Sequence, residues 1–293
     1  MRVLNYGSLN LDYVFSVEHI VLPGETISSS QRELFPGGKG LNQSIALARA
    51  GAEVYHAGAI GPDGALLRET LCAAGVKTDY LHAIDTASGN AIIQVDQNGQ
   101  NSIVLYAGAN HKQTEAAIDS TLSRFGADDI LLLQNETNLV GTLIDKGHAK
   151  GMTIALNPSP FNDVLLACDL RKVDIFLLNE VEGMHLTGET DEKKILHSLG
   201  ERFPNSRIIL TMGEKGVQYR DAQCKYAQAA FPVKVVDTTA AGDTFTGYFL
   251  ASLARNLPVA DALRIASRAS SITVGREGAS VSIPLWAEVE AAL

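Results

Sequence analysis

The chain has 293 residues, of which 46% are hydrophobic, enough to supply a large core. Its 24 basic and 33 acidic residues give a net charge of −9, which argues against a general nucleic-acid binder, because such a protein needs a basic face. No apolar run reaches the roughly 18 residues of a membrane span, and three distant cysteines without a CxxC pair favour a reducing cytoplasm. We therefore expect a cytoplasmic protein that binds neither nucleic acids nor membranes.

Short apolar segments alternate with amphipathic segments along most of the chain. The apolar segments are typical of buried parallel strands and lie at 3–7, 53–60, 129–134, 152–157, 173–178 and 207–212. The amphipathic segments predict helices at 41–50, 65–74, 115–125, 139–150 and 192–202. Strands that alternate with helices predict right-handed βαβ crossovers, and therefore a three-layer αβα fold with a mainly parallel sheet.

Two parts of the chain depart from this alternation. After residue 212 we expect an antiparallel meander, 216–219 and 223–227, and then two long helices, 241–255 and 259–274. Near the N-terminus, segments 10–17 and 28–36 resemble one antiparallel strand pair. Segments 89–95 and 101–106 resemble a second, with a turn that contains the hairpin signal Asn98-Gly99. These inserted strands predict a small β-sheet lid on a single domain that spans residues 1–293.

Segment 237–245, Asp-Thr-Thr-Ala-Ala-Gly-Asp-Thr-Phe, opens a predicted helix. Its small residues leave backbone N–H groups uncovered at the positive end of the helix, where an anion can approach them. Asp243 lies in the first turn, beside that anion site. Its carboxylate could take a proton from an alcohol while the N–H groups stabilise a transferred phosphoryl group. Asp243 could equally serve only to stabilise the helix, and the local pattern leaves both interpretations open.

Segment 36–43, Pro-Gly-Gly-Lys-Gly-Leu-Asn-Gln, joins a predicted strand to the helix at 41–50. Its glycines allow tight turns and the close approach of a ligand. It is not a Walker A loop, because no Gly-Lys-Ser or Gly-Lys-Thr occurs in the chain. The GxGxxG spacing is also missing after the first strand, which disfavours a dinucleotide-dependent oxidoreductase. Taken alone, this loop is more typical of an ordinary glycine-rich turn.

Several polar residues follow predicted strands. Asn10 and Asp12 have the period-two spacing that places both side chains on one strand face, where they could bind vicinal hydroxyls or form an ordinary polar surface. Asn179 and Glu182 fit a phosphate or metal site and equally a capping box at a helix start. Glu136, at another strand end, is similarly ambiguous.

Together these segments resemble the ribokinase-like (phosphofructokinase B) family of sugar kinases. Segment 37–43 resembles the family's first signature and segment 237–245 its second, in the family's order. Shorter matches run through the rest of the chain, at 23–26, 58–64, 107–110, 156–160 and 179–182. Within the family, the sequence is most similar to the kinases that act on ribose.

The resemblance implies an αβα core, a lid that is often shared across a homodimer, and ATP with Mg²⁺. It implies that Asp243 is the catalytic base and that an anion hole is formed by the backbone N–H groups of Ala240, Ala241 and Gly242. The family's sugar-contacting positions are matched by Asn10, Asp12, Gly38, Lys39, Asn42 and Glu136. Its nucleotide-binding positions are matched by Asn179, Thr211, Gly213 and Gly216, and Glu182 matches a residue that holds a Mg²⁺-bound water. Relatives also bind an activating cation such as K⁺, at positions matched by Asp237, Thr239, Thr273, Gly278 and Ser282.

We therefore expect an ATP-dependent kinase that phosphorylates the primary hydroxyl of a small sugar, converting D-ribose to ribose 5-phosphate. Three departures from the family pattern leave the substrate open. Leu41 stands where a small residue is usual, Asn90 stands where an apolar lid residue is commoner, and segment 267–273 lacks the family's adenine-side asparagine. The alternatives are a kinase for another pentose, a ketose or a nucleoside, and a non-catalytic sugar- or nucleotide-binding protein.

Overall fold

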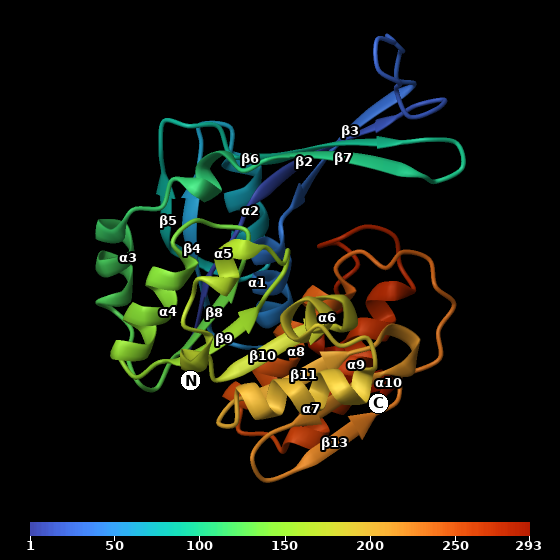
Figure 1. The fold of residues 1–293 in the computed structure, drawn as a ribbon. Helices are drawn as coiled ribbons and strands as arrows, with labels where there is room; N and C mark the ends of the chain where they lie inside the picture. Colours follow the sequence, from blue (N-terminus) through green and yellow to red (C-terminus); the bar gives the residue numbers. More distant parts are fainter.

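The computed structural model describes residues 1–293 and contains two β-sheets. The larger is nine-stranded and lies in the middle of the molecule (Figure 1). In spatial order its strands are β13 (Lys225–Gln228), β12 (Val217–Arg220), β11 (Arg207–Thr211), β10 (Ile175–Asn179), β9 (Thr153–Asn157), β8 (Ile130–Gln134), β1 (Val3–Tyr6), β4 (Val54–Ile60) and β5 (Lys77–Ala83). Only β12 and β13 run antiparallel to their neighbours. The mainly parallel sheet is therefore confirmed, together with the predicted meander at its edge.

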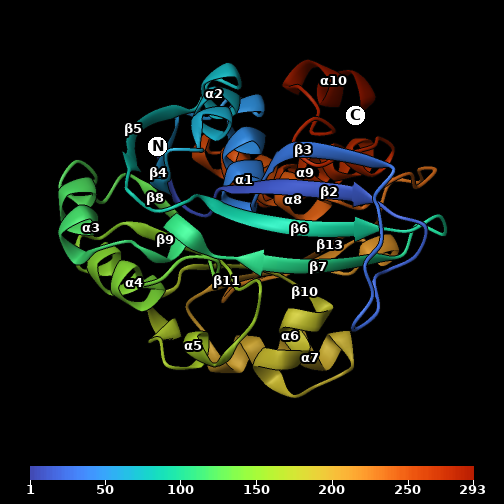
Figure 2. The same ribbon diagram turned by 90° about the horizontal axis from the view of Figure 1, so that it is seen from above.

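Helices cover both faces of this sheet (Figure 2). One face is covered by α1 (Lys39–Arg49), α2 (Ala65–Ala73), α8 (Ala241–Ala254), α9 (Val259–Val274) and α10 (Trp286–Ala292). The other is covered by α3 (Glu115–Leu122), α4 (Val140–Ala149), α5 (Asp163–Leu166), α6 (Glu180–Thr187) and α7 (Glu192–Arg202). No helix is long and apolar enough to cross a membrane. The structure thus has the three layers that the sequence predicts.

Alternate residues of the central strands belong to two separate cores. Val3 and Leu132 pack against α1 and α8, whereas Leu4 and Leu133 pack on the opposite side, against α3 and α4. Successive side chains of a strand point to opposite faces, so a strand buried on both faces must be apolar at every position. This is why these strands appear in the sequence as continuous apolar segments.

The smaller sheet has the order β3-β2-β6-β7 and projects from the body of the molecule (Figures 1 and 2). Its strands are β2 (Asn10–Ser16), β3 (Gln31–Gly37), β6 (Gly89–Val95) and β7 (Asn101–Tyr106). Strands β2 and β3 are antiparallel, as are β6 and β7, and β2 pairs with β6 in parallel. The predicted lid is confirmed, although β3 begins at residue 31 rather than 28.

Four strands and α-helices were missing from the predicted ranges: β5, the four-residue helix α5, α6 and α10. Strand β5 lies at the sheet edge, pairs only with β4 and begins with three polar residues, Lys-Thr-Asp, so it lacks the apolar run of a central strand. Helix α6 is only eight residues long. Helix α10 begins at Trp286, whose ring stacks on Tyr248. These elements depend on neighbours that are distant in the sequence and carry weak local signals.

Candidate active site

The candidate site lies where the parallel strands of the main sheet end. The carboxyl ends of β1, β8, β9, β10 and β11 share one edge, which is the usual position of a ligand in an open α/β sheet. The lid begins just after β1, with β2. Helix α8 begins at the same edge. Residues of its first turn line one cavity of about 200 Å³ together with residues of β9, β10 and β11.

The start of α8 is a cluster of uncovered backbone N–H groups. Ala240, the N-cap residue, has a left-handed backbone (φ 60°), an unusual conformation for an alanine. Gly242 is exposed, and a Cβ atom added there would meet no atom within 4 Å. The N–H groups of Gly242 and Asp243 have no acceptor within the protein. The geometry therefore suits an anion at the positive end of the helix.

Asp243 is buried, with 7% of its surface exposed, and lines the 200 Å³ cavity. Its two carboxylate oxygens accept hydrogen bonds from side-chain amides on α1. Asn42 Nδ2 lies 3.0 Å from Oδ2, and Gln43 Nε2 lies 2.8 Å from Oδ1. The carboxylate is thus oriented by two donors and adjoins the uncovered N–H groups. A carboxylate held beside an anion site can accept a proton during transfer of a charged group.

Acidic and basic side chains meet between the lid and the main sheet. Burial, together with the charge of Glu136, raises the pKa of Asp12 to about 7. Burial also raises the pKa of Glu136, against the opposing effects of a hydrogen bond from the Ser8 hydroxyl and the charge of Lys39. Burial disfavours the charged form of Lys39, but nearby carboxylates outweigh burial and its pKa is raised. These residues form a polar, partly dehydrated cluster.

The backbone of the 37–40 turn packs against this cluster. The N–H of Lys39 donates to Glu136 Oε2 at 3.1 Å. A Cβ atom at Gly38 would lie 3.0 Å from the carbonyl oxygen of Ser8, so the turn approaches the β1–β2 connection closely. Asn10, on β2, is held by Asn110, whose Nδ2 lies 2.8 Å from its Oδ1. The predicted sugar-binding residues Asn10, Asp12, Gly38, Lys39 and Glu136 therefore lie close to one another, where β2 meets the start of α1.

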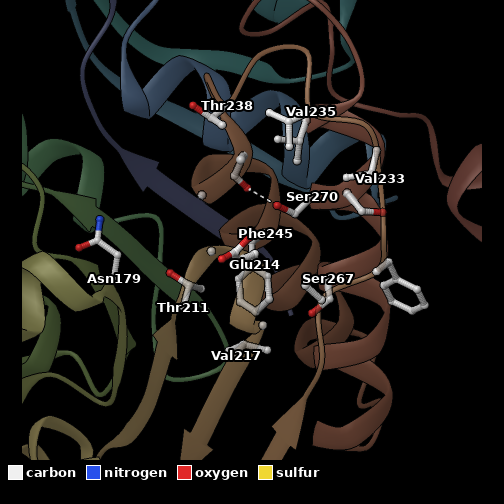
Figure 3. A pocket seen from close by; sticks show the side chains of 18 of the residues that line it. Asn179, Thr211, Glu214, Val217, Val233, Val235, Thr238, Phe245, Ser267 and Ser270 are labelled. Atoms are coloured by element: carbon white, nitrogen blue, oxygen red, sulfur yellow. Dashed lines mark hydrogen bonds between the residues drawn. The ribbon is translucent and has the colours of Figure 1, made fainter. Parts of the chain in front are cut away.

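A larger cavity of about 830 Å³ lies beside the small one (Figure 3). The two share six lining residues, so they form one continuous space: Asn179, Thr211, Thr238, Ala241, Gly242 and Phe245. Gly213 and Gly216 also line the large cavity; both have left-handed backbones, and a Cβ atom at Gly216 would lie 2.2 Å from the carbonyl oxygen of Gln228. The volume is in the range of small-molecule and cofactor sites.

The far end of the large cavity combines apolar side chains with serine hydroxyls (Figure 3). Phe231, Val233 and Val235 come from the segment before α8, and the serines come from α9. Ser270 Oγ donates to the carbonyl oxygen of Ala241 at 3.0 Å, which ties α9 to the start of α8. An apolar wall beside a chain of polar groups suits a flat aromatic base attached to phosphates.

Asn179 and Glu182 form a capping box at the start of α6. Asn179 Oδ1 accepts from the N–H of Glu182 at 2.9 Å, and Glu182 Oε2 accepts from the N–H of Asn179 at 3.0 Å. This structural interpretation does not exclude ligand binding, because both residues also line the small cavity and Glu182 Oε1 has no hydrogen-bond partner. Mg²⁺ is often held by one or two carboxylates together with waters and substrate phosphates. One carboxylate with a free oxygen fits that pattern, and no cluster of three potential metal ligands exists in the chain.

Two of the predicted cation-binding residues, Thr239 and Gly278, donate hydrogen bonds to a third, Asp237. Partial burial would raise the pKa of Asp237, but hydrogen bonds from Thr239 and from the N–H of Gly278 outweigh it and lower the pKa. The N–H of Asp237 donates to the carbonyl oxygen of Val274, the residue after Thr273. The hydroxyl of Thr273 lies 3.0 Å from the hydroxyl of Thr244. Ser282 is buried and bonds to a backbone carbonyl oxygen. Carboxylate, hydroxyl and carbonyl oxygens are suitable donors for a hard cation.

Sequence reasoning gave no role to four amides behind the site, three of them buried and one, Asn157, half-buried. Gln43 contacts Asp243, and Gln134, Asn5 and Asn157 connect it to β8, β1 and β9. The sequence did contain a signal for a buried polar network, because Gln134, Asn5 and Asn157 are each a polar residue in an otherwise apolar strand.

Comparisons with known proteins agree with this geometry. Residues 2–286 match the pfkB family of carbohydrate kinases. A ribokinase of Haemophilus influenzae is 35% identical over 290 residues, which cover 95% of this chain and 94% of that protein. The crystal structure of ribokinase from Cryptococcus neoformans in complex with ADP matches with a TM-score of 0.89 at 35% identity, over 100% of this chain and 99% of that chain. Ribokinase of Arabidopsis thaliana complexed with ribose and ATP matches with a TM-score of 0.88 at 28% identity, over 99% and 97% of the two chains.

Proposed function

The chain belongs to the pfkB family of carbohydrate kinases, and we propose from this premise that it transfers the γ-phosphoryl group of ATP to the primary hydroxyl of D-ribose. The observation that carries the proposal is the position of Asp243, whose carboxylate lines a cavity beside the uncovered N–H groups of α8. The name ribokinase on relatives of nearly equal length supports ribose as the sugar. The ribose- and ATP-bound relative of the same fold gives further support.

In the proposed reaction, Asp243 accepts the proton of the sugar hydroxyl while that oxygen attacks the γ-phosphorus of ATP. The bond between the γ-phosphorus and the bridging oxygen breaks, and ADP leaves. Backbone N–H groups of Ala240, Ala241 and Gly242 stabilise the negative charge on the transferred group, and that of Ala241 would first exchange its acceptor, the Thr238 carbonyl oxygen 3.3 Å away, for the phosphoryl oxygen. When bound, Mg²⁺ would neutralise phosphate charge near Glu182. Lys39, whose raised pKa keeps it charged, adds a further positive charge at the small cavity.

We assign the sugar to a pocket beside this polar cluster, between the lid and the main sheet. The residues proposed to bind it are Asn10, Asp12, Gly38, Lys39, Asn42 and Glu136. Ionised Asp12 and Glu136 can accept hydrogen bonds from vicinal hydroxyls, and Asn10 offers an amide. Closure of the lid over this pocket would exclude water and so limit wasteful hydrolysis of ATP.

We assign ATP to the 830 Å³ cavity, with its phosphates at Asn179, Thr211, Gly213 and Gly216. The base would lie against Phe231 and Val233, near the α9 serines. We further propose that K⁺ binds near Asp237, with oxygen donors from Thr239, Thr273, Gly278 and Ser282. Asp237 and Thr239 directly precede the anion hole in the sequence. A cation bound to them would order the start of α8 and so activate the enzyme.

We also propose that two lids associate to form a homodimer. Exposed apolar side chains gather on the lid: Leu34, Phe35, Ile92, Ile103, Val104, Leu105 and Tyr106. Phe35 and Leu105 share the sheet face that carries Asp12, whereas Leu34, Ile92 and Val104 lie on the opposite face. An apolar face pointing away from the site fits contact with a second copy. We place the enzyme in the cytoplasm, where its three unpaired cysteines would stay reduced.

A panel of sugars tests the proposed substrate. ADP release is measured with D-ribose, other pentoses, ketoses and nucleosides, with and without K⁺. We expect the highest kcat/KM with D-ribose. A higher value with another acceptor would replace ribose, and the absence of acceptor-dependent ADP release would remove the kinase assignment.

The Asp243→Asn variant tests the proposed base. It should retain binding of sugar and ATP in calorimetry and lose roughly a thousandfold or more in kcat, because an amide cannot take the proton. Turnover near that of the wild type would show that Asp243 is not the base.

A further inference from the structure

A continuous chain of buried polar side chains leads away from Asp243 into the protein. Gln43 Nε2 donates to Asp243 Oδ1 at 2.8 Å, and Gln43 Oε1 accepts from Gln134 Nε2 at 2.6 Å. The same nitrogen of Gln134 lies 2.9 Å from Asn5 Oδ1. Asn5 Nδ2 then donates to Ser44 Oγ at 2.8 Å. The chain thus joins α8, α1, β8 and β1, and each of its side-chain groups is almost completely inaccessible to water.

The direction of every hydrogen bond in this chain is determined by its two ends. An ionised carboxylate only accepts, so Gln43 must turn its NH₂ group toward Asp243 and its carbonyl oxygen toward Gln134. Gln134 must therefore donate to Gln43. At the other end, Ser44 accepts from Asn5, so its hydroxyl donates to His56 Nδ1, 2.8 Å away. Burial lowers the pKa of His56 to about 4, which keeps the ring neutral and able to accept.

The far end of the chain is anchored to rigid structure. Asn5 Nδ2 also donates to the carbonyl oxygen of Gly40 at 2.8 Å, which fixes the first turn of α1. Gln43 Nε2 has a second acceptor, Asn157 Oδ1, at 3.2 Å on β9. Gln43 therefore has partners at both ends of its amide and one available orientation, because any rotation would leave a buried polar atom unpaired. Gln134 is held by its NH₂ group alone, since its buried Oε1 has no partner; turning the amide over would place that oxygen against the oxygens of Gln43 and Asn5.

We propose that Gln43 is a positioning residue for the base Asp243 and that Gln134 acts through Gln43 to hold it in the orientation that donates to the carboxylate. This inference rests on the proposed kinase function and extends it to residues that touch no substrate. Neither glutamine lines the large or the small cavity. Their effect is therefore on the orientation of the carboxylate, and a misplacement of about 1 Å at a reacting group can cost on the order of 100-fold in rate.

Three variants test the proposal: Gln43→Met, Gln134→Met and the double variant. Methionine keeps the length of the side chain and removes the amide. We expect kcat to fall about 10- to 100-fold for Gln43→Met and about 3- to 10-fold for Gln134→Met, with the KM values for sugar and ATP changed less than twofold. Because Gln134 acts through Gln43, the double variant should be no slower than Gln43→Met alone.

Gln113→Met is the matched control. Gln113 is another buried glutamine bonded at both ends of its amide, to Tyr6 and to the carbonyl oxygen of Ala109, but it does not contact the chain that leads to Asp243. This control should lose thermal stability comparably and keep the wild-type kcat. Equal losses of kcat in the control and in Gln43→Met would overturn the proposal, as would multiplicative effects in the double variant or a kcat unchanged by Gln43→Met.

A crystal structure of Gln43→Met separates failure of this inference from failure of the proposed function. We expect its Asp243 carboxylate to be rotated or shifted relative to the wild type. An unmoved carboxylate would overturn the positioning role even if the wild type phosphorylates sugars. A displaced carboxylate in a protein without kinase activity would retain the positioning role and remove the function.

Discussion

The affinity for sugar should depend on pH through the carboxyl group of Asp12. Burial and the neighbouring charge of Glu136 raise its pKa from 3.8 to about 7. Only the ionised form accepts two hydrogen bonds from adjacent hydroxyls, so protonation removes acceptors from the sugar pocket. At a pKa of about 7 half of the Asp12 carboxyl groups are ionised at pH 7 and roughly a tenth at pH 6, so the KM for sugar should rise about fivefold between pH 7 and pH 6. Glu136, whose pKa burial also raises, should steepen this rise at lower pH.

The same shift predicts an effect on stability. Between about pH 4 and pH 7 the folded state binds more protons at Asp12 than the unfolded state does, because the folded pKa is the higher one. Its contribution to the free energy of unfolding therefore falls as the pH rises through this window. The full cost above pH 7 is up to about 4 kcal/mol, since each pKa unit corresponds to about 1.4 kcal/mol. Asp12→Asn removes this cost and should raise Tm most at pH 8.

Initial rates over a range of sugar concentrations, from pH 5.5 to 8.5 at constant ionic strength, measure the first effect. The KM for ATP is followed in parallel as an internal control and should change much less. In Asp12→Asn the KM for sugar should be high at every pH. A wild-type KM for sugar that stays constant between pH 6 and pH 8 would refute the reasoning, as would an unaltered pH profile in the variant.

Three further substitutions give distinct expectations. A methyl group at Gly37 would lie 2.0 Å from the Asp12 carboxylate, so Gly37→Ala should raise the KM for sugar at least tenfold and leave that for ATP unchanged in steady-state assays. A methyl group at Gly247 would lie 2.4 Å from Ala46 Cβ, so Gly247→Ala should separate α8 from α1 and lower the free energy of unfolding by about 1–3 kcal/mol in urea titrations. Val104 is 65% exposed on the lid face opposite Asp12, so Val104→Asp should shift the proposed dimer toward monomer in sedimentation experiments, and an unchanged mass would argue against this interface.

The fold could be predicted largely from periodicity, because burial on both faces imposes a continuous apolar segment on each central strand. Leu131 and Leu132 face different cores, and a polar residue at either position would lie in an apolar layer. Edge strand β5 escaped prediction for the same physical reason, since its exposed face permits polar residues. The lid could be predicted from the Asn98-Gly99 turn, whose geometry depends on local residues alone.

The site was only partly predictable, because its chemistry depends on distances that no local pattern encodes. Asp243 and the small residues before it could be recognised, since an anion site at a helix start is a local feature. The orientation of the Asp243 carboxylate comes instead from Gln43, 200 positions earlier, and through it from Gln134. A buried glutamine at the end of an apolar strand costs stability when its amide lacks partners, and here the NH₂ group of Gln134 has two acceptors although its Oε1 has none. Its presence in β8 therefore indicates a partner elsewhere, and only the fold identifies that partner as the amide that holds the proposed base.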